Sequence, residues 1–508
     1  MASEARISTL VLAGLVLALI LPMILAPKVR AHAFGAPIEV LPAPPELYWL
    51  GGALVVLLTF LLLAFFLREG VGIYPRLRLF RFNMSGKLGI VVSLLIYTLK
   101  AVFLLFLVLL IVAGILGSPR SADNIAPLIV WVAGFVGLTI LHAIIGNLWS
   151  LVNPWVTLYE LIFPRSRGKA LLEYPKRLGI WPAFILLLIF AWIELAYPGS
   201  ASPRDLGLLA LIYTIINLVG MRLFGPSAWI GNCEFLSIYF RYVSSISPFE
   251  VSMASNDKPM HSTGREEVII SWKSWKNLDI EIYLRPPALG TLGFGGLGVS
   301  STAFILLMLS SVSFDGFSRT LLWYNMLGLR PFPTPSRDEM IPYTTAGLLI
   351  GFIAFASIYT LTMILTWFIA IRRGLGSYKL IDLVEGFAAT LIPIAFVYYI
   401  AHYMVFLQIN IQYFIKHLSD PMGFGWNIFG TKNYSPNLYI DHFTVWHTQV
   451  ALIVGGHILA VYASHIKALK MFKPSKSSEL ILALSPLTIL MIFYTVFGLW
   501  LISAPGAG

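Results

Sequence analysis

The stretch DHFTVWHTQVALIVGGHILAVYASHIKALK, residues 441–470, decides the fold class of this chain. Its apolar part, which we predict to be a helix over 444–465, is long enough to span a bilayer. A polar imidazole in hydrocarbon costs free energy unless it finds a partner, so intramembrane histidines are candidate functional groups. The stretch carries four of the nine histidines of the chain: His442, His447, His457 and His465.

The spacing of these histidines shows that the helix cannot form a site alone. His447 and His465 are 18 residues apart, which places them on one helical face but about 27 Å apart along the axis. His457 lies between them, about 80° around the helix from His465. Two such distant side chains cannot bind one metal ion, so the partners of each histidine must come from other segments.

The composition is that of a polytopic membrane protein. Hydrophobic residues make up 58% of the 508 residues and charged residues 12%, with a mean hydropathy of +0.82, whereas soluble domains carry about 25% charged residues. The lipid bilayer is therefore the predicted environment. The net charge of +11 is not a nucleic-acid footprint, because basic residues in membrane proteins mark cytoplasmic loops. The single cysteine, Cys233, excludes an internal disulfide and Cys-rich metal sites.

Residues 1–31 have the pattern of a signal peptide. Arg6 precedes a long apolar core, and the segment ends in VRA, with small residues at the spacing of a cleavage site. Cleavage after Ala31 would make His32 the mature N-terminus. An uncleaved signal anchor is the alternative, because the apolar core approaches spanning length. The remainder, 32–508, is predicted to form one polytopic membrane domain.

Ten further apolar runs predict an all-α membrane helix bundle; they lie at 48–67, 92–116, 126–147, 178–197, 205–224, 297–314, 344–370, 384–408, 444–465 and 479–503. Every second loop is rich in Lys and Arg, namely 68–87, 148–177, 225–296, 371–383 and 466–478. These loops are predicted to be cytoplasmic. We therefore expect a multi-pass protein of the cell membrane with both mature termini extracytoplasmic.

Two loops are long enough to carry structure of their own. The first part of the predicted cytoplasmic insertion 225–296, WIGNCEFLSIYFRYVSSISPFE, is amphipathic and is expected at the membrane interface. Its second part contains EVIISW and IEIYLRPP, two alternating runs that could pair as a hairpin. The predicted extracytoplasmic loop 409–443 adds the polar residues His417, Asp420 and Asp441.

The predicted topology gathers imidazole and carboxylate groups on the outer side. The candidates for a metal site there are His32, His402, His442 and His447, with Glu194, Asp315 and Asp420 as candidate general bases or further ligands. Imidazole and carboxylate suit zinc, copper or iron, and an N-terminal histidine favours copper(II). The structural alternative is that each histidine only bonds a neighbouring helix, and that Asp315 forms a salt bridge at a helix end.

Two other kinds of site remain open at this point. His402 paired with His457 or with His142 could ligate a haem iron axially. Alternatively, Lys100 in LLIYTLKAVFLLF could mark a polar cavity or extend to the interface, and Pro393 predicts a kink in the helix that carries His402. Broken helices line the cavities of transporters.

Several motifs carry a resemblance to a known family. SSVSFDGFSRTLLWYN, LIPIAFVYYIAHYMVFLQINIQ, SDPMGFGWNIFGT, GGHILAVYASHIKAL and YTVFGLWLIS occur in this order, after GNLWSLVNPW and LGIWPAF…FAWIELAYP and an Ala-His behind a signal. Over nearly its whole length the chain resembles the integral membrane proteins of the fenitrothion hydrolase family. The resemblance implies a many-helix membrane fold and hydrolysis of an organophosphate P–O ester. The family positions that map here are His32, Asp315, His402, Asp420, His457 and His465.

The chain departs from that family in its own histidines. His442 and His447 are outside the family pattern, and Asn427 stands where an acidic residue is expected.

The sequence leaves three functions open. The first is a hydrolase in which a metal on His402 and an outer histidine activates water, with Asp315 or Asp420 as base. The second is a copper- or haem-binding membrane subunit of a redox complex, with other subunits as partners. The third is a transporter or assembly scaffold.

Overall fold

The fold is seen in a computed structural model, which describes residues 44–67, 76–164, 170–255, 258–261, 279–294, 297–474 and 476–504. The predicted signal segment 1–31 and His32 lie outside the described residues. The described chain is predominantly α-helical, and it confirms the prediction of an all-α polytopic helix bundle.

Nine helices of the described part are long and apolar enough to cross a membrane: α2 (Pro45–Phe66), α3 (Lys87–Leu116), the combined η2 and α4 (Leu128–Ile145), α8 (Pro203–Phe224), α11 (Val299–Ser318), α13 (Arg337–Arg372), the combined α14, η7 and α15 (Leu380–His417), α16 (His442–Phe472) and α17 (Ser477–Ser503). Each coincides with a predicted span. The tenth predicted span, 178–197, contains a shorter apolar helix, α7 (Trp181–Leu195).

Short helices connect these spans. They are α5 (Trp149–Val152), α6 (Pro154–Ile162), α9 (Pro226–Asn232), α10 (Phe235–Ser244) and α12 (Leu321–Met326), together with the single turns η1 (Ser121–Asp123), η3 (Lys176–Leu178), η4 (Pro198–Ala201), η6 (Leu289–Gly293) and η8 (Thr431–Asn433).

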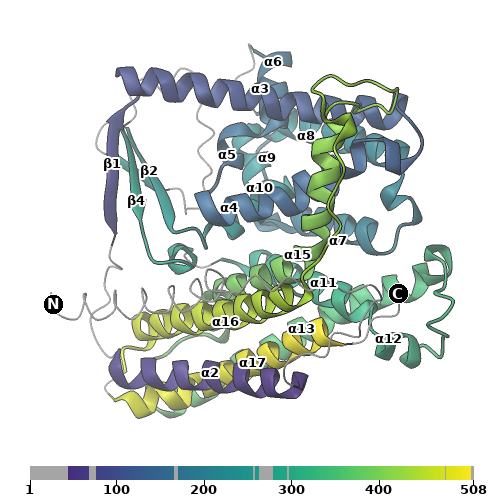
Figure 1. Ribbon diagram of the computed structural model, residues 1–508. Helices are drawn as coiled ribbons and strands as arrows, with labels where there is room; N and C mark the ends of the chain where they lie inside the picture. Colours follow the sequence, from purple (N-terminus) through teal and green to yellow (C-terminus); the bar gives the residue numbers. More distant parts are fainter. Residues whose placement is uncertain are drawn as a thin grey trace.

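Two helices, α11 and α15, form the centre of the bundle. In Figure 1 α11 lies between one group that includes α3, α4, α8, α9 and α10 and a second group that includes α2, α13, α16 and α17, and α15 extends from there across the first group. Helix α11 is buried along most of its length. A polar side chain on α11, or on the part of α15 up to Tyr403, therefore lies mostly within protein.

The helix that carries His402 is interrupted, as Pro393 predicts. Helix α14 (Leu380–Ala388) ends in a short 3₁₀ turn, η7 (Ala389–Leu391), and α15 (Ile392–His417) begins there with Pro393 in its first turn. Proline is tolerated at this position because its missing N–H would be unpaired anyway. Helix α15 also continues through His417, so the outer loop predicted as 409–443 begins after that residue.

Glycines let two helices of the first group approach closely. A Cβ atom on Gly114 of α3 would lie 2.6 Å from the carbonyl oxygen of Pro203 and 2.7 Å from Cα of Gly207 on α8. Small residues at such crossings replace side-chain interdigitation with direct backbone packing, which is the common solution inside membranes. The α3–α8 pair therefore depends on both glycines.

A small antiparallel sheet covers one end of the bundle. Its order is β1–β4–β2–β3, formed by β1 (Leu77–Asn83), β4 (Asp279–Leu284), β2 (Phe249–Ser255) and β3 (Lys258–His261). The sheet lies at the end of the helices opposite α12 (Figure 1). The predicted hairpin is corrected in part, because β4 pairs with β1 and β2, while the EVIISW run lies outside the described residues.

Helix α10 differs from the interfacial helix predicted for the start of 225–296. Every residue of α10 except Leu236 is buried, and the helix packs against α4, α7, α9 and α15. An interfacial helix keeps one face toward headgroups and water. Helix α10 is instead enclosed by protein on nearly all sides.

Candidate functional site

Four side chains meet at the end of the bundle away from the sheet, and we call them the acid–histidine cluster: Glu194, Asp315, His402 and Tyr403. His402 Nε2 lies 2.7 Å from Asp315 Oδ2. The hydroxyl of Tyr403 lies 2.8 Å from the same Oδ2 and 2.6 Å from Glu194 Oε1. Asp315 is only 2% exposed. The structure thus brings together three residues that the sequence nominated separately.

The backbone packing of α11 and α15 brings the cluster together. Asp315 is near the end of α11, and His402 and Tyr403 are adjacent on α15. Gly316 follows Asp315, and a Cβ atom there would collide with the Tyr398 hydroxyl on α15. The Tyr398 ring stacks on His402 with centroids 6.1 Å apart. Gly316 therefore makes the room that lets α15 present His402 to Asp315.

Asp315 is held by three donors. Besides His402 and Tyr403, Arg319 Nε lies 2.9 Å from Asp315 Oδ1, one helical turn further along. The Arg319 side chain is 64% exposed, so solvent screens its charge. A carboxyl group with a guanidinium on one oxygen and two donors on the other is ionised and accepts every one of these bonds.

The ionised Asp315 determines the tautomer of His402. A carboxylate only accepts hydrogen bonds, so the proton must lie on His402 Nε2, and Nδ1 of the neutral ring carries the lone pair. The His402 side chain is 14% exposed. The arrangement is that of an orienting carboxylate and a histidine base, as in the acid–base half of hydrolytic triads.

Tyr403 links the two carboxyl groups through one hydroxyl. A hydroxyl has one proton to donate, yet it lies within hydrogen-bond distance of Glu194 and of Asp315. Asp315 already accepts hydrogen bonds from His402 and Arg319. Among the described residues, Glu194 has only the Tyr403 hydroxyl as a side-chain partner. The arrangement is satisfied when Tyr403 donates to Asp315 and the carboxyl group of Glu194 retains a proton and donates to Tyr403.

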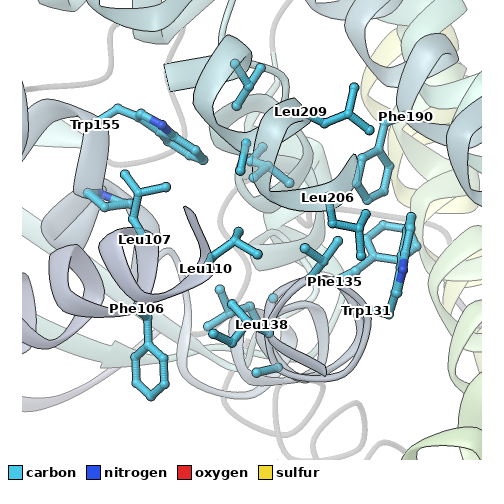
Figure 2. Close-up of a pocket in the computed structure, with 18 of the residues that line it drawn as sticks. Phe106, Leu107, Leu110, Trp131, Phe135, Leu138, Trp155, Phe190, Leu206 and Leu209 are labelled. Atoms are coloured by element: carbon cyan, nitrogen blue, oxygen red, sulfur yellow. The ribbon is translucent and has the colours of Figure 1, made fainter. Parts of the chain in front are cut away.

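A large apolar cavity adjoins the cluster. A hollow of about 20 Å³ is lined by Glu194 and Tyr403, and Phe135 and Phe190 form another part of its wall. The same two phenylalanines line a cavity of about 590 Å³ between α3, η2, α7 and α8. Figure 2 shows Phe135 and Phe190 beside Trp131 at one end of this cavity, with Trp155 at the other end. The volume lies within the roughly 300–1,000 Å³ of small-molecule sites.

The outer loop residue Asp420 has a structural role away from the cluster. Its two carboxylate oxygens accept hydrogen bonds from the backbone N–H groups of Phe424, at 2.9 Å, and Gly425, at 2.7 Å. Both oxygens thereby hold the turn after α15. In the described part of the chain no hydrogen bond or ion pair joins Asp420 to the cluster, so the prediction of Asp420 as the base is not supported by the geometry.

The first histidines of α16 lie apart from His402 as well. His442 is exposed at the start of α16. His447 lies 2.8 Å from the Phe443 carbonyl oxygen through Nδ1 and 3.2 Å from the Tyr48 hydroxyl through Nε2. His417, in the same outer region, bonds the carbonyl oxygens of Tyr413 and Ala122. Hydrogen bonds of this kind, to backbone carbonyl oxygens and to a hydroxyl on a neighbouring helix, support the packing of the helices.

The predicted copper or zinc site finds no ligand set in the described residues. No group of three or more His, Cys, Asp or Glu side chains is placed there to hold a metal ion. His402 commits Nε2 to Asp315, and His447 uses both ring nitrogens. The described residues therefore give no support for His402, His442 and His447 as common ligands, and the metal site stays a prediction.

The buried histidines proposed for haem have separate surroundings. His142 lies 2.6 Å from the Leu138 carbonyl oxygen and accepts at 2.8 Å from the Trp149 N–H, so both its ring nitrogens are used. His457 bonds the Ile453 carbonyl oxygen at 2.8 Å, and its buried Nε2 has no hydrogen-bond partner among the described residues. His465 bonds the Leu67 carbonyl oxygen at 3.0 Å. The bonds of His142 give no support for its pairing with His402, and both haem pairings stay predictions.

Sequence reasoning missed one member of the cluster, Tyr403, and one residue bonded to the cluster, Arg319. Tyr403 directly follows His402 in the AHY motif, and Arg319 follows Asp315 by one helical turn in SFDGFSR. The i,i+4 spacing of Asp315 and Arg319 was the available signal. Lys100, by contrast, pairs with Glu160 at 3.7 Å, which satisfies its charge without a functional cavity.

Comparison with known proteins adds no relative: no family model, no curated protein and no solved structure matches this chain. The assignment of function therefore depends on the geometry of the acid–histidine cluster.

Proposed function

We propose that the protein is a membrane hydrolase that acts on a neutral, apolar ester, of the organophosphate class that the family resemblance implies. The observation that carries the proposal is the 2.7 Å bond between His402 Nε2 and the buried Asp315. This bond leaves His402 Nδ1 as a base that can take a proton from water. Asp315 orients the ring and stabilises the imidazolium that forms.

Each group of the cluster has a defined part in this reaction. Water loses a proton to His402 Nδ1 as its oxygen bonds to phosphorus, and the ester P–O bond breaks. The leaving group departs as an anion when that anion is stable. Otherwise its oxygen takes the proton from the imidazolium. Arg319 and Arg337 place positive charge at this end of the bundle: Arg337 donates to the Glu194 carbonyl oxygen at 3.1 Å. Such charge favours the anionic transition state.

The apolar cavity beside the cluster supports an apolar substrate. Three of the helices that line it, α3, η2 with α4, and α8, are candidate membrane spans. A neutral ester dissolved in the bilayer could therefore reach Phe135 and Phe190 without crossing water. We place the protein in the cell membrane with the cluster on the extracytoplasmic side, because the loops at the sheet end are the Lys- and Arg-rich ones.

The test is hydrolysis of a neutral phosphotriester with a 4-nitrophenolate leaving group by the purified, detergent-solubilised protein. We expect His402→Gln and Asp315→Asn each to lower kcat by about 10²–10⁴-fold, the usual contribution of general acid–base catalysis. His442→Gln is the matched control, because this exposed histidine lies outside the cluster, and it should leave kcat unchanged. Equal turnover by wild type and His402→Gln would contradict the proposal.

A proton relay is the second candidate, favoured by the bridging position of Tyr403. The chain Glu194–Tyr403–Asp315–His402 is continuous at 2.6, 2.8 and 2.7 Å, and intramembrane chains of this kind carry protons in transporters. In liposomes that contain a pH-sensitive dye, a relay predicts proton flux that Tyr403→Phe abolishes. Absence of flux in the wild type, together with phosphotriester turnover, would leave hydrolysis as the function.

A further inference from the structure

A second polar site lies at the other end of the bundle, around the buried arginine Arg241, whose guanidinium carbon lies 5.7 Å from the centroid of the Tyr242 ring. Arg241 of α10 is 6% exposed. Its Nη1 atom is buried and has no hydrogen-bond partner, and no ion pair involves its guanidinium among the described residues. Arginine is almost never buried unless its charge is paired, because an isolated buried charge carries a large desolvation cost. The described residues therefore place no anion in hydrogen-bond contact with Arg241 Nη1.

The carboxylate that bonds Arg285, Glu250, is engaged by arginines other than Arg241. Arg285, 4% exposed, lies with Arg241 on the wall of one small pocket. The acid of this region, Glu250, is already shared: Oε1 lies 3.0 Å from Arg76 and Oε2 lies 3.3 Å from Arg285. Two guanidinium groups thus share this carboxylate, and no ion pair in the described part of the chain joins it to Arg241. Arg241 itself is therefore open to an anionic ligand from outside the described chain.

The pocket itself has the size and lining for a small oxyanion. Its volume is about 60 Å³, several times the roughly 10–15 Å³ needed for one water molecule. Besides the two arginines, polar side chains line it, namely Asn147, Ser150, Ser244 and Ser245. Guanidinium groups match phosphate oxygens in geometry and charge, and none of the described residues that line the pocket is a carboxylate that would favour a cation.

The depth of the pocket in the bundle favours the same ligand. The membrane span Leu128–Ile145 ends immediately before Gly146, which lines the pocket, and Phe249 and Val251 of β2 close it from the sheet side. The pocket therefore lies where a span leaves the hydrocarbon, at the level of lipid headgroups. We propose that this pocket binds a phosphate group through Arg241, taken from a phospholipid headgroup or from free phosphate.

The test compares two probes on the full-length protein in detergent. Inorganic phosphate is titrated while the unfolding temperature is followed, and retention of phosphatidylglycerol from added vesicles is measured by native mass spectrometry against diacylglycerol, which lacks the phosphate. We expect at least one probe to bind, and Arg241→Gln to weaken it about tenfold or more. Arg373→Gln, which removes an exposed arginine at the end of α13, is the control and should bind as the wild type does.

Two further outcomes complete the design. Stabilisation by inorganic phosphate alone assigns free phosphate as ligand, and selective retention of phosphatidylglycerol assigns the headgroup. Asn147→Asp places a carboxylate on the same wall, so it should abolish binding while the protein remains folded. Binding by Arg241→Gln or by Asn147→Asp at wild-type affinity would overturn the proposal, as would failure of both probes to bind the wild type.

Discussion

Asp315 shows how much one buried side chain depends on its donors. Arg319, His402 and Tyr403 each contribute one hydrogen bond to it. A buried carboxylate that loses a donor bears the desolvation cost of the unpaired oxygen, about 1–3 kcal/mol. The cluster is therefore a stability element as well as a candidate active site.

Substitution of Tyr403 tests this dependence at the residue scale. Tyr403→Phe keeps the ring and removes the hydroxyl that bridges Glu194 and Asp315. We expect the free energy of unfolding to fall by about 1–3 kcal/mol, measured by chemical denaturation in detergent. Tyr48→Phe, which removes only the 3.2 Å contact with His447, should cost less. A wild-type stability for Tyr403→Phe would show that the hydroxyl bonds contribute nothing.

At the scale of helices, the α3–α8 crossing is set by Gly114 and Gly207. Gly114→Leu would push side-chain atoms into the backbone of α8, which we expect to lower the free energy of unfolding by about 1–3 kcal/mol or more. Gly51→Leu is the matched control, because a Cβ atom at Gly51 of α2 meets nothing within 4 Å. Unfolding temperature and gel filtration of both variants would show whether the crossing needs glycine.

The sheet is predicted to be sensitive to acid. Hydrogen bonds from Asn83, and next from Arg81, lower the pKa of Asp279 below its usual value, so the folded sheet favours the charged carboxylate. The contribution of Asp279 to the pairing of β1 with β4 is thus fully present above about pH 4, the pKa of an aspartate in the unfolded chain. It weakens as the pH falls through the lower pKa of the folded state.

Hydrogen exchange of residues 77–83 measures this effect. After correction for intrinsic rates, protection of β1 in the wild type should decrease as the pH is lowered below about 4, and Asp279→Asn should show less protection and less dependence on pH. If Asp279→Asn retained the acid sensitivity of the wild type, another group would control the sheet.

At the scale of the whole molecule, strand pairing constrains the number of membrane crossings. Strands β1 and β4 pair, so residues 83 and 279 lie on one side of the membrane. The long spans between them are α3, η2 with α4, and α8. Three crossings would separate the strands, so the short helix α7 must supply a fourth. Its 15 residues cover about 22 Å, less than the roughly 30 Å hydrocarbon core, which requires local thinning of the bilayer.

Labelling of single cysteines tests this topology. In a Cys233→Ser background, Arg78→Cys in β1 and Lys432→Cys in the loop after α15 are separated by seven crossings if α7 spans. A membrane-impermeant maleimide should therefore label them from opposite sides of the membrane in oriented vesicles. Labelling of both from the same side would show that α7 does not cross.

The sequence by itself determined the membrane class, the positions of the spans and the interruption at Pro393. These features follow from local hydropathy and backbone chemistry, which are properties of contiguous residues. The sequence also singled out Asp315, His402 and Glu194, because ionisable groups in apolar helices are conspicuous.

Only the tertiary structure decided which of these groups meet. It joined Glu194, Asp315 and His402 through Tyr403, and it assigned Asp420 to a turn. Which side chains come into contact depends on how each helix is rotated about its axis and on close approaches between helices, such as the one at Gly316. They involve residues up to 209 positions apart, and local patterns carry no information about contacts at that separation.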